Sequence, residues 1–86
     1  MIVGEGKGDT VMNDLKFLEL LKAGKPIFIE NEIEELVYDF TNYPVIRVKS
    51  KSGKIVKRKY KNSCKSDVDT LLYGKEITEE RFDQFA

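Results

Sequence analysis

The feature that most constrains the fold is a pair of β-rich runs within residues 44–60, separated by the polar sequence Ser-Lys-Ser-Gly. A three-residue loop over residues 51–53, with Gly53 in the left-handed conformation, places Val48 opposite Val56. A two-residue turn would instead place a lysine opposite each of these valines. The sequence therefore predicts an antiparallel hairpin with the three-residue loop.

The same register makes one face of the hairpin largely apolar, because it also pairs Ile46 with Arg58 and Pro44 with Tyr60. Strand side chains alternate between two faces, so we expect both valines to point into the core. The opposite face carries four basic side chains that we expect to point to solvent: Arg47, Lys49, Lys57 and Lys59.

An amphipathic helix is expected from Asn13 to Ala23. Apolar side chains recur there at the spacing of one helix face, and these are Met12, Leu15, Leu18 and Leu21, widened by Phe17 and Leu20. Gly24 suits the position after a helix end, and Pro26 prevents the helix from continuing. We expect this apolar stripe to pack on the core.

Two segments before the hairpin are expected to be strands. Residues 26–29, Pro-Ile-Phe-Ile, are β-rich and end at a charged run. Residues 33–40 carry both helical and alternating apolar spacing, and Val37 and Tyr38 favour a strand over residues 36–40. Four acidic residues favour a solvated turn over a divalent-cation site, since their spacing matches no EF-hand: Glu30, Glu32, Glu34 and Glu35.

Two short helices are expected after the hairpin. Ser66 can cap the first, which would extend to Leu72 and end before Gly74. Thr78, followed by two glutamates, is typical of the N-cap of a second helix, from which Phe85 can dock on the sheet. The residues expected in the core here are Leu71, Leu72, Ile77 and Phe82.

Residues 1–11 are expected to form a flexible arm, because three glycines alternate with charged residues and no apolar periodicity is present. The glycine spacing matches neither a dinucleotide-binding nor a P-loop motif. A native start at Met12 is an open alternative. Residues 12–86 are expected to form a single α+β domain, in which helices cover one face of an antiparallel sheet of about three to five strands.

Charge is unevenly distributed along the chain. Fifteen basic and fifteen acidic residues balance, but nine of the basic ones and none of the acidic ones lie in residues 41–66. That segment therefore carries +9 and the remainder −9. This separation predicts one basic surface and one or two acidic surfaces.

Composition excludes several classes of chemistry. The chain has no histidine, and its one cysteine, Cys64, cannot complete a zinc site or an intrachain disulfide. As a nucleophile, Cys64 would lack a base. We therefore expect no enzymatic activity, no cofactor and no metal. The lone cysteine and the absence of a long apolar run predict a cytoplasmic protein without a membrane association.

The basic hairpin is the candidate binding surface. Its cationic side chains could contact phosphates while flanking tyrosines stack on unpaired bases, although charged hairpin faces are also ordinary solvated surfaces. Acidic residues elsewhere would repel a duplex, so a protein partner is favoured and nucleic acid is the alternative. The expected binding residues are Arg47, Lys49, Lys57, Lys59 and Tyr43.

In layout, the chain resembles the small accessory proteins of bacteriophages and prophages of Gram-positive bacteria. The resemblance lies in a short helix ending Leu-Lys-Ala-Gly-Lys, a strand, a charged hairpin and a last helix beginning Ile-Thr-Glu-Glu-Arg-Phe. It implies a non-enzymatic protein that binds a protein partner as an inhibitor or regulator. It carries over no functional residue.

Overall fold

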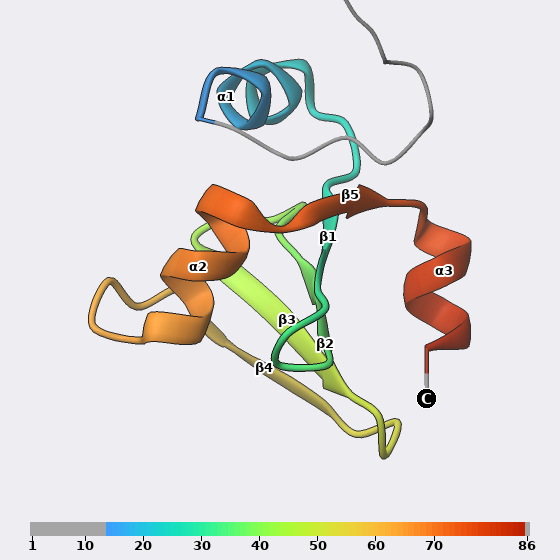
Figure 1. Ribbon diagram of the computed structural model, residues 1–86. Helices are drawn as coiled ribbons and strands as arrows, with labels where there is room; N and C mark the ends of the chain where they lie inside the picture. Colours follow the sequence, from blue (N-terminus) through green and yellow to red (C-terminus); the bar gives the residue numbers. More distant parts are fainter. Residues whose placement is uncertain (1–13, 86) are drawn as a thin grey trace, which may run out of the picture.

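The computed structural model describes residues 14–85 and contains a five-stranded antiparallel sheet (Figure 1). The strands are β1 (Phe28–Asn31), β2 (Leu36–Asp39), β3 (Val45–Ser50), β4 (Ile55–Lys59) and β5 (Lys75–Ile77), and their order across the sheet is β4-β3-β2-β1-β5. The helices within this range are α1 (Asp14–Ala23), α2 (Lys65–Tyr73) and α3 (Glu79–Gln84). The expected α+β fold is confirmed, whereas the expected arm over residues 1–11 lies outside the described residues.

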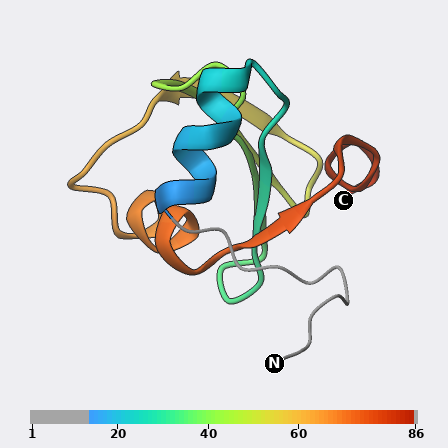
Figure 2. The same ribbon diagram turned by 90° about the horizontal axis from the view of Figure 1, so that it is seen from above.

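The helices cover both faces of the sheet. Seen from above, α1 and α2 lie on one side of β1 and α3 lies on the other (Figure 2). In the central strands, the adjacent residues Phe28 and Ile29 are both buried, as are Val37 and Tyr38 in β2, which confirms the strand expected there. Because adjacent strand residues point to opposite faces, both faces need a cover. The expectation of a single covered face is wrong for this reason.

Each face has its own core. The core under α1 and α2 consists of Phe17, Ile27, Ile29, Tyr38, Phe40 and Ile46, with Leu71 of α2 packed against it. The core under α3 consists of Phe28, Val37, Phe82 and Phe85, with Ile77 packed against it. The two phenylalanines of the C-terminal segment therefore dock on the sheet as expected, but Leu72, which was expected in the core, is 39% exposed.

The apolar stripe of α1 is rotated relative to the expected one. Phe17 is buried, and Leu20 and Leu21 pack on the same core. Leu15 and Leu18, which were expected to be buried, are 76% and 48% exposed. Residues 17, 20 and 21 form one face of the helix, and each step along the chain turns the side chain by about 100°, which carries Leu18 away from that face.

Helix ends and turns follow the expected chemistry at most positions. Gly24 after α1 and Gly53 in the hairpin loop have φ angles of 69° and 86°. The Thr78 hydroxyl accepts a hydrogen bond from a backbone N–H of the first turn of α3, which confirms its N-cap role. The N-cap of α2 is Cys64, so the expected cap at Ser66 is wrong, and Ser66 lies within the first turn.

The hairpin of β3 and β4 has the predicted register. Val48 lies opposite Val56, and Ile46 lies opposite Arg58. Val48 packs against the core, but Val56 is 44% exposed. Among the described residues, the core under α1 and α2 includes side chains of β3 and none of β4. The expectation that Val56 points into the core is therefore wrong, because none of the helices within residues 14–85 covers it.

Candidate functional site

The structure separates the five residues expected to bind a partner. Arg47 and Lys49 lie on β3, Lys57 and Lys59 lie on β4, and Tyr43 precedes β3. Of these five, Lys57 and Lys59 are exposed, on a strand at the edge of the sheet. Arg47 is half-buried, and its Nε and Nη2 lie 2.8 and 2.7 Å from a carboxylate oxygen of the neighbouring strand β2.

Lys49 is a buried structural residue, so the expectation that it points to solvent is wrong. It is 8% exposed. Its Nζ donates hydrogen bonds to the carbonyl oxygens of Phe82 and Asp83, at 3.0 and 2.7 Å. These carbonyls belong to the last turn of α3, where the helix dipole favours a cation, and the Phe82 carbonyl also accepts a hydrogen bond of 3.3 Å from the Phe85 N–H. Lys49 therefore holds α3 on the sheet.

Replacing Lys49 with Ala is expected to lower the free energy of unfolding by about 1–3 kcal/mol, because the Asp83 carbonyl loses the charged donor and the Phe82 carbonyl keeps only the hydrogen bond of 3.3 Å from the Phe85 N–H. The matched variant Lys57→Ala removes an exposed lysine from the adjacent strand and is expected to stay within about 0.5 kcal/mol of the parent. Urea unfolding followed by circular dichroism measures both. Equal stability of the two variants would contradict the structural role of Lys49.

Tyr43 belongs to a cluster of aromatic rings. The centroid of its ring lies 5.3 Å from that of Phe17, in an edge-to-face arrangement, and 5.5 Å from that of Tyr60. Both tyrosines are half-buried. Their rings contact one another and the core, which leaves less of each ring available to stack on a base.

β4 forms one edge of the sheet, with β3 as its neighbour. The Tyr60 N–H donates to the Pro44 carbonyl at 2.8 Å, and the Ser50 N–H donates to the Lys54 carbonyl at 3.2 Å. These two bonds show which residue pairs of the antiparallel ladder are hydrogen-bonded. Hydrogen bonding alternates along such a ladder, so the N–H groups of Ile55, Lys57 and Lys59 point away from β3. β4 therefore presents a row of outward backbone groups, of which the Lys59 carbonyl already accepts a hydrogen bond of 3.1 Å from the Arg58 guanidinium.

Apolar side chains flank this edge on both faces of the sheet. Ile55 and Val56 are each 44% exposed and, as adjacent strand residues, point to opposite faces. On the face of Val56 lies a hollow of about 230 Å³, lined by Leu36, Val48, Ser50, Lys54, Val56 and Arg58. On the other face, Ile55 shares its side with Lys57 and Lys59. We name β4 and this hollow the β4 edge site.

A buried ion pair anchors β4 to α2. Arg58 donates from both terminal nitrogens to Asp67, each at 2.7 Å, and the side chain of Asp67 is 0% exposed. Asp67 also accepts hydrogen bonds from the Tyr38 hydroxyl at 2.9 Å and from the Lys61 N–H at 3.1 Å. Burial raises the pKa of Asp67, but the hydrogen bonds from Arg58, Tyr38 and Lys61 outweigh burial, so this pKa lies below its usual value. The pair holds the edge strand in a fixed position.

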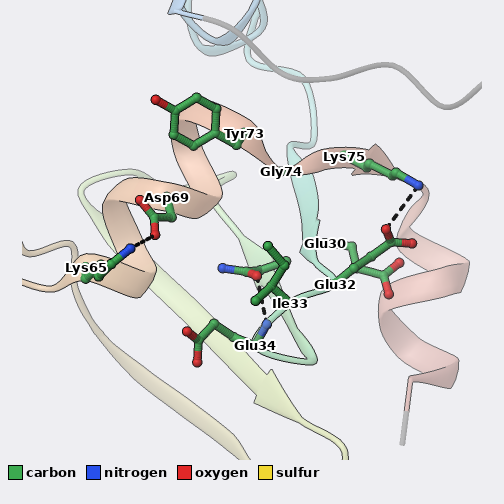
Figure 3. A pocket seen from close by; sticks show the side chains of 10 residues that line it. Glu30, Glu32, Ile33, Glu34, Lys65, Asp69, Tyr73, Gly74 and Lys75 are labelled. Atoms are coloured by element: carbon green, nitrogen blue, oxygen red, sulfur yellow. Dashed lines mark hydrogen bonds and ion pairs between the residues drawn. The ribbon is translucent and has the colours of Figure 1, made fainter.

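A second hollow, of about 410 Å³, lies between the turn that joins β1 and β2 and one side of α2 (Figure 3). Ile33 and Tyr73, which line it, are 93% and 72% exposed. The ion pairs drawn there join Lys75 to Glu32 at 3.1 Å and Lys65 to Asp69 at 2.6 Å. Glu32, Glu34 and Glu35 are exposed, as expected from the sequence, but the expectation is wrong for Glu30, which is buried in β1 and accepts a hydrogen bond of 2.9 Å from Arg81. Among residues 14–85 no three His, Cys, Asp or Glu side chains gather as a metal site requires. We name this hollow the acidic-turn pocket.

Comparison with known proteins assigns the chain to no family. A scan against protein-family models, a search of curated proteins and a search of solved structures each found no match. In the part of the chain that the structure describes, no helix is both long and apolar enough to span a bilayer. The geometry of the β4 edge site therefore carries the functional inference.

Proposed function

We propose that this chain is a non-enzymatic protein that binds an extended segment of a partner protein at the β4 edge site. The observation that carries the proposal is the row of outward backbone groups along β4, with Ile55 and Val56 exposed beside it. In strand addition, main-chain hydrogen bonds supply affinity and alternate side chains supply specificity. β4 offers backbone hydrogen-bonding groups and alternating side chains to one incoming strand.

The charge of the β4 edge site selects among incoming strands. Lys57 and Lys59 are exposed on it. Lysines on an edge strand deter unwanted edge-to-edge pairing, because they repel strands of like charge. A segment that carries carboxylates is attracted instead, and complementary charge raises the rate of association.

Strand addition makes or breaks no covalent bond, so the proposed function needs no catalytic group, cofactor or metal. A segment held at the β4 edge site is unavailable to other binding partners, which would make the protein an inhibitor or regulator. The ion pair between Arg58 and Asp67 supports this role, because an edge that is already fixed costs less entropy to bind. The resemblance in layout to phage and prophage accessory proteins agrees with the same class of activity.

Nucleic-acid binding through the basic hairpin is the alternative. The exposed Lys57 and Lys59 favour it, since both could contact phosphates. Three features weigh against it: Lys49 is buried, Arg47 is ion-paired and Tyr43 packs against the core. Binding of an oligonucleotide, with log affinity falling linearly against log salt concentration, would favour the alternative.

A peptide selection with two matched variants tests the proposed function. Short random peptides displayed on phage are selected on the protein and then assayed against Lys57→Pro and Lys57→Ala. Lys57→Pro removes the outward N–H, and proline is tolerated on an edge strand where that N–H makes no ladder hydrogen bond. Lys57→Ala removes the charged side chain but keeps the outward N–H. We expect the selected peptides to lose about tenfold or more in affinity with Lys57→Pro and clearly less with Lys57→Ala.

Thermal unfolding establishes that both variants are folded at the assay temperature. Val56→Glu provides a second disruption of the same site, since the residue is 44% exposed and the change replaces an apolar contact by a charge. The proposed function is wrong if no peptide is enriched. It is also wrong if the enriched peptides bind the parent and all variants equally.

A further inference from the structure

We infer that the segment bound at the β4 edge site runs antiparallel to β4 and has acidic residues at two alternate positions, followed by two adjacent apolar residues. This inference rests on the proposed function and specifies the partner: a protein with an extended segment of this acidic and apolar pattern. It is carried by the order of side chains along β4 and by the hollow beside them.

The side chains of β4 divide between the two faces of the sheet. Lys57 and Lys59 share a face with Ile55, whereas Val56 and Arg58 lie on the face with the hollow. A residue of an added strand lies on the same face as the β4 residue opposite it, with the two Cβ atoms about 4.5–5.5 Å apart. Each β4 residue therefore sets the favoured chemistry at one position of the added strand.

The positions opposite Lys57 and Lys59 favour carboxylates. Both lysines are exposed, and neither forms an ion pair with another of residues 14–85. Opposite charges across a strand pair are stabilising, and like charges are destabilising. Arg58, between the two lysines, is committed to Asp67 through two hydrogen bonds of 2.7 Å, so the position opposite it is unspecified.

The positions opposite Val56 and Ile55 favour apolar residues. Both side chains are 44% exposed and lose that exposure when an apolar residue covers them. An apolar side chain opposite Val56 also lies beside the hollow of about 230 Å³, because Val56 is one of the residues that line it. Covering this face buries the part of Val56 that the helices within residues 14–85 leave exposed.

An antiparallel strand meets these positions in the order acidic, unspecified, acidic, apolar, apolar. Every strand pairing in the sheet is antiparallel. Antiparallel ladders are also slightly more stable per residue than parallel ones. A parallel strand would need the reverse order, so the direction can be tested with peptides of equal composition.

A second copy of this chain is a poor occupant of the site. β4 has the sequence Ile-Val-Lys-Arg-Lys. Pairing between two β4 strands would bring Lys57 and Lys59 close to the same lysines of the other copy, and like charges across a strand pair are destabilising. Charge complementarity therefore favours a separate, acidic segment.

Four labelled peptides with identical neutral flanks test the pattern by fluorescence anisotropy. The matching peptide has the core Glu-Thr-Glu-Val-Val, written from the N-terminus. The other cores are the reversed Val-Val-Glu-Thr-Glu, the charge-exchanged Lys-Thr-Lys-Val-Val and the apolar-free Glu-Thr-Glu-Ser-Ser. We expect the matching peptide to bind the parent about tenfold or more tightly than each of the others, because several small cross-strand gains combine.

The double variant Lys57→Glu/Lys59→Glu is the matched protein for this assay. We expect it to prefer the charge-exchanged peptide over the matching one, because inverting the charges on both sides restores the two ion pairs. A reversal of preference measures the interaction between the paired groups and is not produced by general damage to the fold.

Equal binding of the matching and charge-exchanged peptides to the parent, or tighter binding of the reversed peptide, would overturn the inferred pattern. If peptides from the random selection still bind and Lys57→Pro abolishes their binding, the proposed function stands and the pattern alone is wrong. If Lys57→Pro changes the affinity of no peptide, the proposed function is wrong, and the inferred pattern is then wrong as well.

Discussion

Replacing Asp67 with Asn is expected to lower the free energy of unfolding by about 3 kcal/mol, the lower end of the cost of removing one partner from a buried ion pair. The side chain of Asp67 is 0% exposed, and its carboxylate accepts a hydrogen bond from each terminal nitrogen of Arg58. The asparagine amide leaves Arg58 without its counter-charge. Its NH₂ group also faces groups that are themselves hydrogen-bond donors, among them the Arg58 guanidinium. We place the effect at the lower end because the side chain of Arg58 is 29% exposed, so water replaces part of the lost pairing. Urea unfolding measures this cost.

Acid unfolding checks the same ion pair. In the folded protein the pKa of Asp67 lies below its usual value, since hydrogen bonds to the carboxylate outweigh its burial. A group with a lowered pKa stabilises the folded state above its unfolded pKa and loses that contribution as the pH falls through its folded pKa. We expect the stability of the parent to fall as the pH drops below about 4, and Asp67→Asn to remove part of this dependence.

Asp69 offers a matched control in the same helix. Its ion pair with Lys65, at 2.6 Å, involves a lysine side chain that is 86% exposed. Exposed pairs contribute about 0–1 kcal/mol, so Asp69→Asn is expected to change stability little. If Asp67→Asn and Asp69→Asn cost the same, the buried pair does not anchor β4.

Replacing Phe82 with Ala is expected to lower the free energy of unfolding by about 3–5 kcal/mol, the usual cost of removing a buried aromatic ring. Phe82 is 1% exposed, and its ring centroid lies 5.3 Å from that of Phe28. The guanidinium of Arg47 lies over the same ring, 5.1 Å from its centroid. The variant removes the contact that places α3 on the second face of the sheet, and thermal unfolding measures the loss.

Tyr73→Ala provides the control for this change. Tyr73 is also aromatic and lies at the end of a helix, but it is 72% exposed. Its removal is expected to change stability by about 0.5 kcal/mol or less. A small effect of Phe82→Ala, comparable with that of Tyr73→Ala, would show that α3 does not contribute a core of its own.

The hairpin and the cap of α3 could be predicted from the sequence because their determinants are local. The loop over residues 51–53 and the alternation on either side of it specify the register, and Gly53 supplies the positive φ that the loop needs. The Thr78 hydroxyl accepts a hydrogen bond from the Arg81 N–H, three residues along the chain. The common face of Lys57 and Lys59 follows from the same alternation, whereas their exposure depends on the position of β4 at the edge of the sheet.

The burial of Lys49 could not be predicted from the hairpin. Its hydrogen-bond acceptors in α3 lie 33 and 34 positions further along the chain. Alternation shows which residues share a face, but tertiary packing decides which element covers that face. Val56 illustrates the converse, because it is apolar and no helix in the described part of the chain covers it. The hollow in the β4 edge site exists for that reason.

The buried ion pair and the fifth strand depend on distant partners as well. Tyr38 and Asp67, which share a hydrogen bond, are separated by 29 positions. β5 is three residues long and is defined by its pairing with β1, so its own sequence carries too short an alternation to predict a strand. In α1, the wide apolar stripe did not show which side faces the core, and contact with the sheet buries the side that contains Phe17.

Hydrogen exchange along β4 tests strand addition most directly. The N–H groups of residues 55, 57 and 59 point away from β3, whereas those of the residues between them point towards it. With the tightest-binding peptide at saturation, we expect exchange of the amides at 57 and 59 to slow by about tenfold or more, because an added strand accepts hydrogen bonds from them. Unchanged exchange along β4, with chemical-shift changes concentrated at Ile33 and Tyr73 of the acidic-turn pocket, would contradict strand addition.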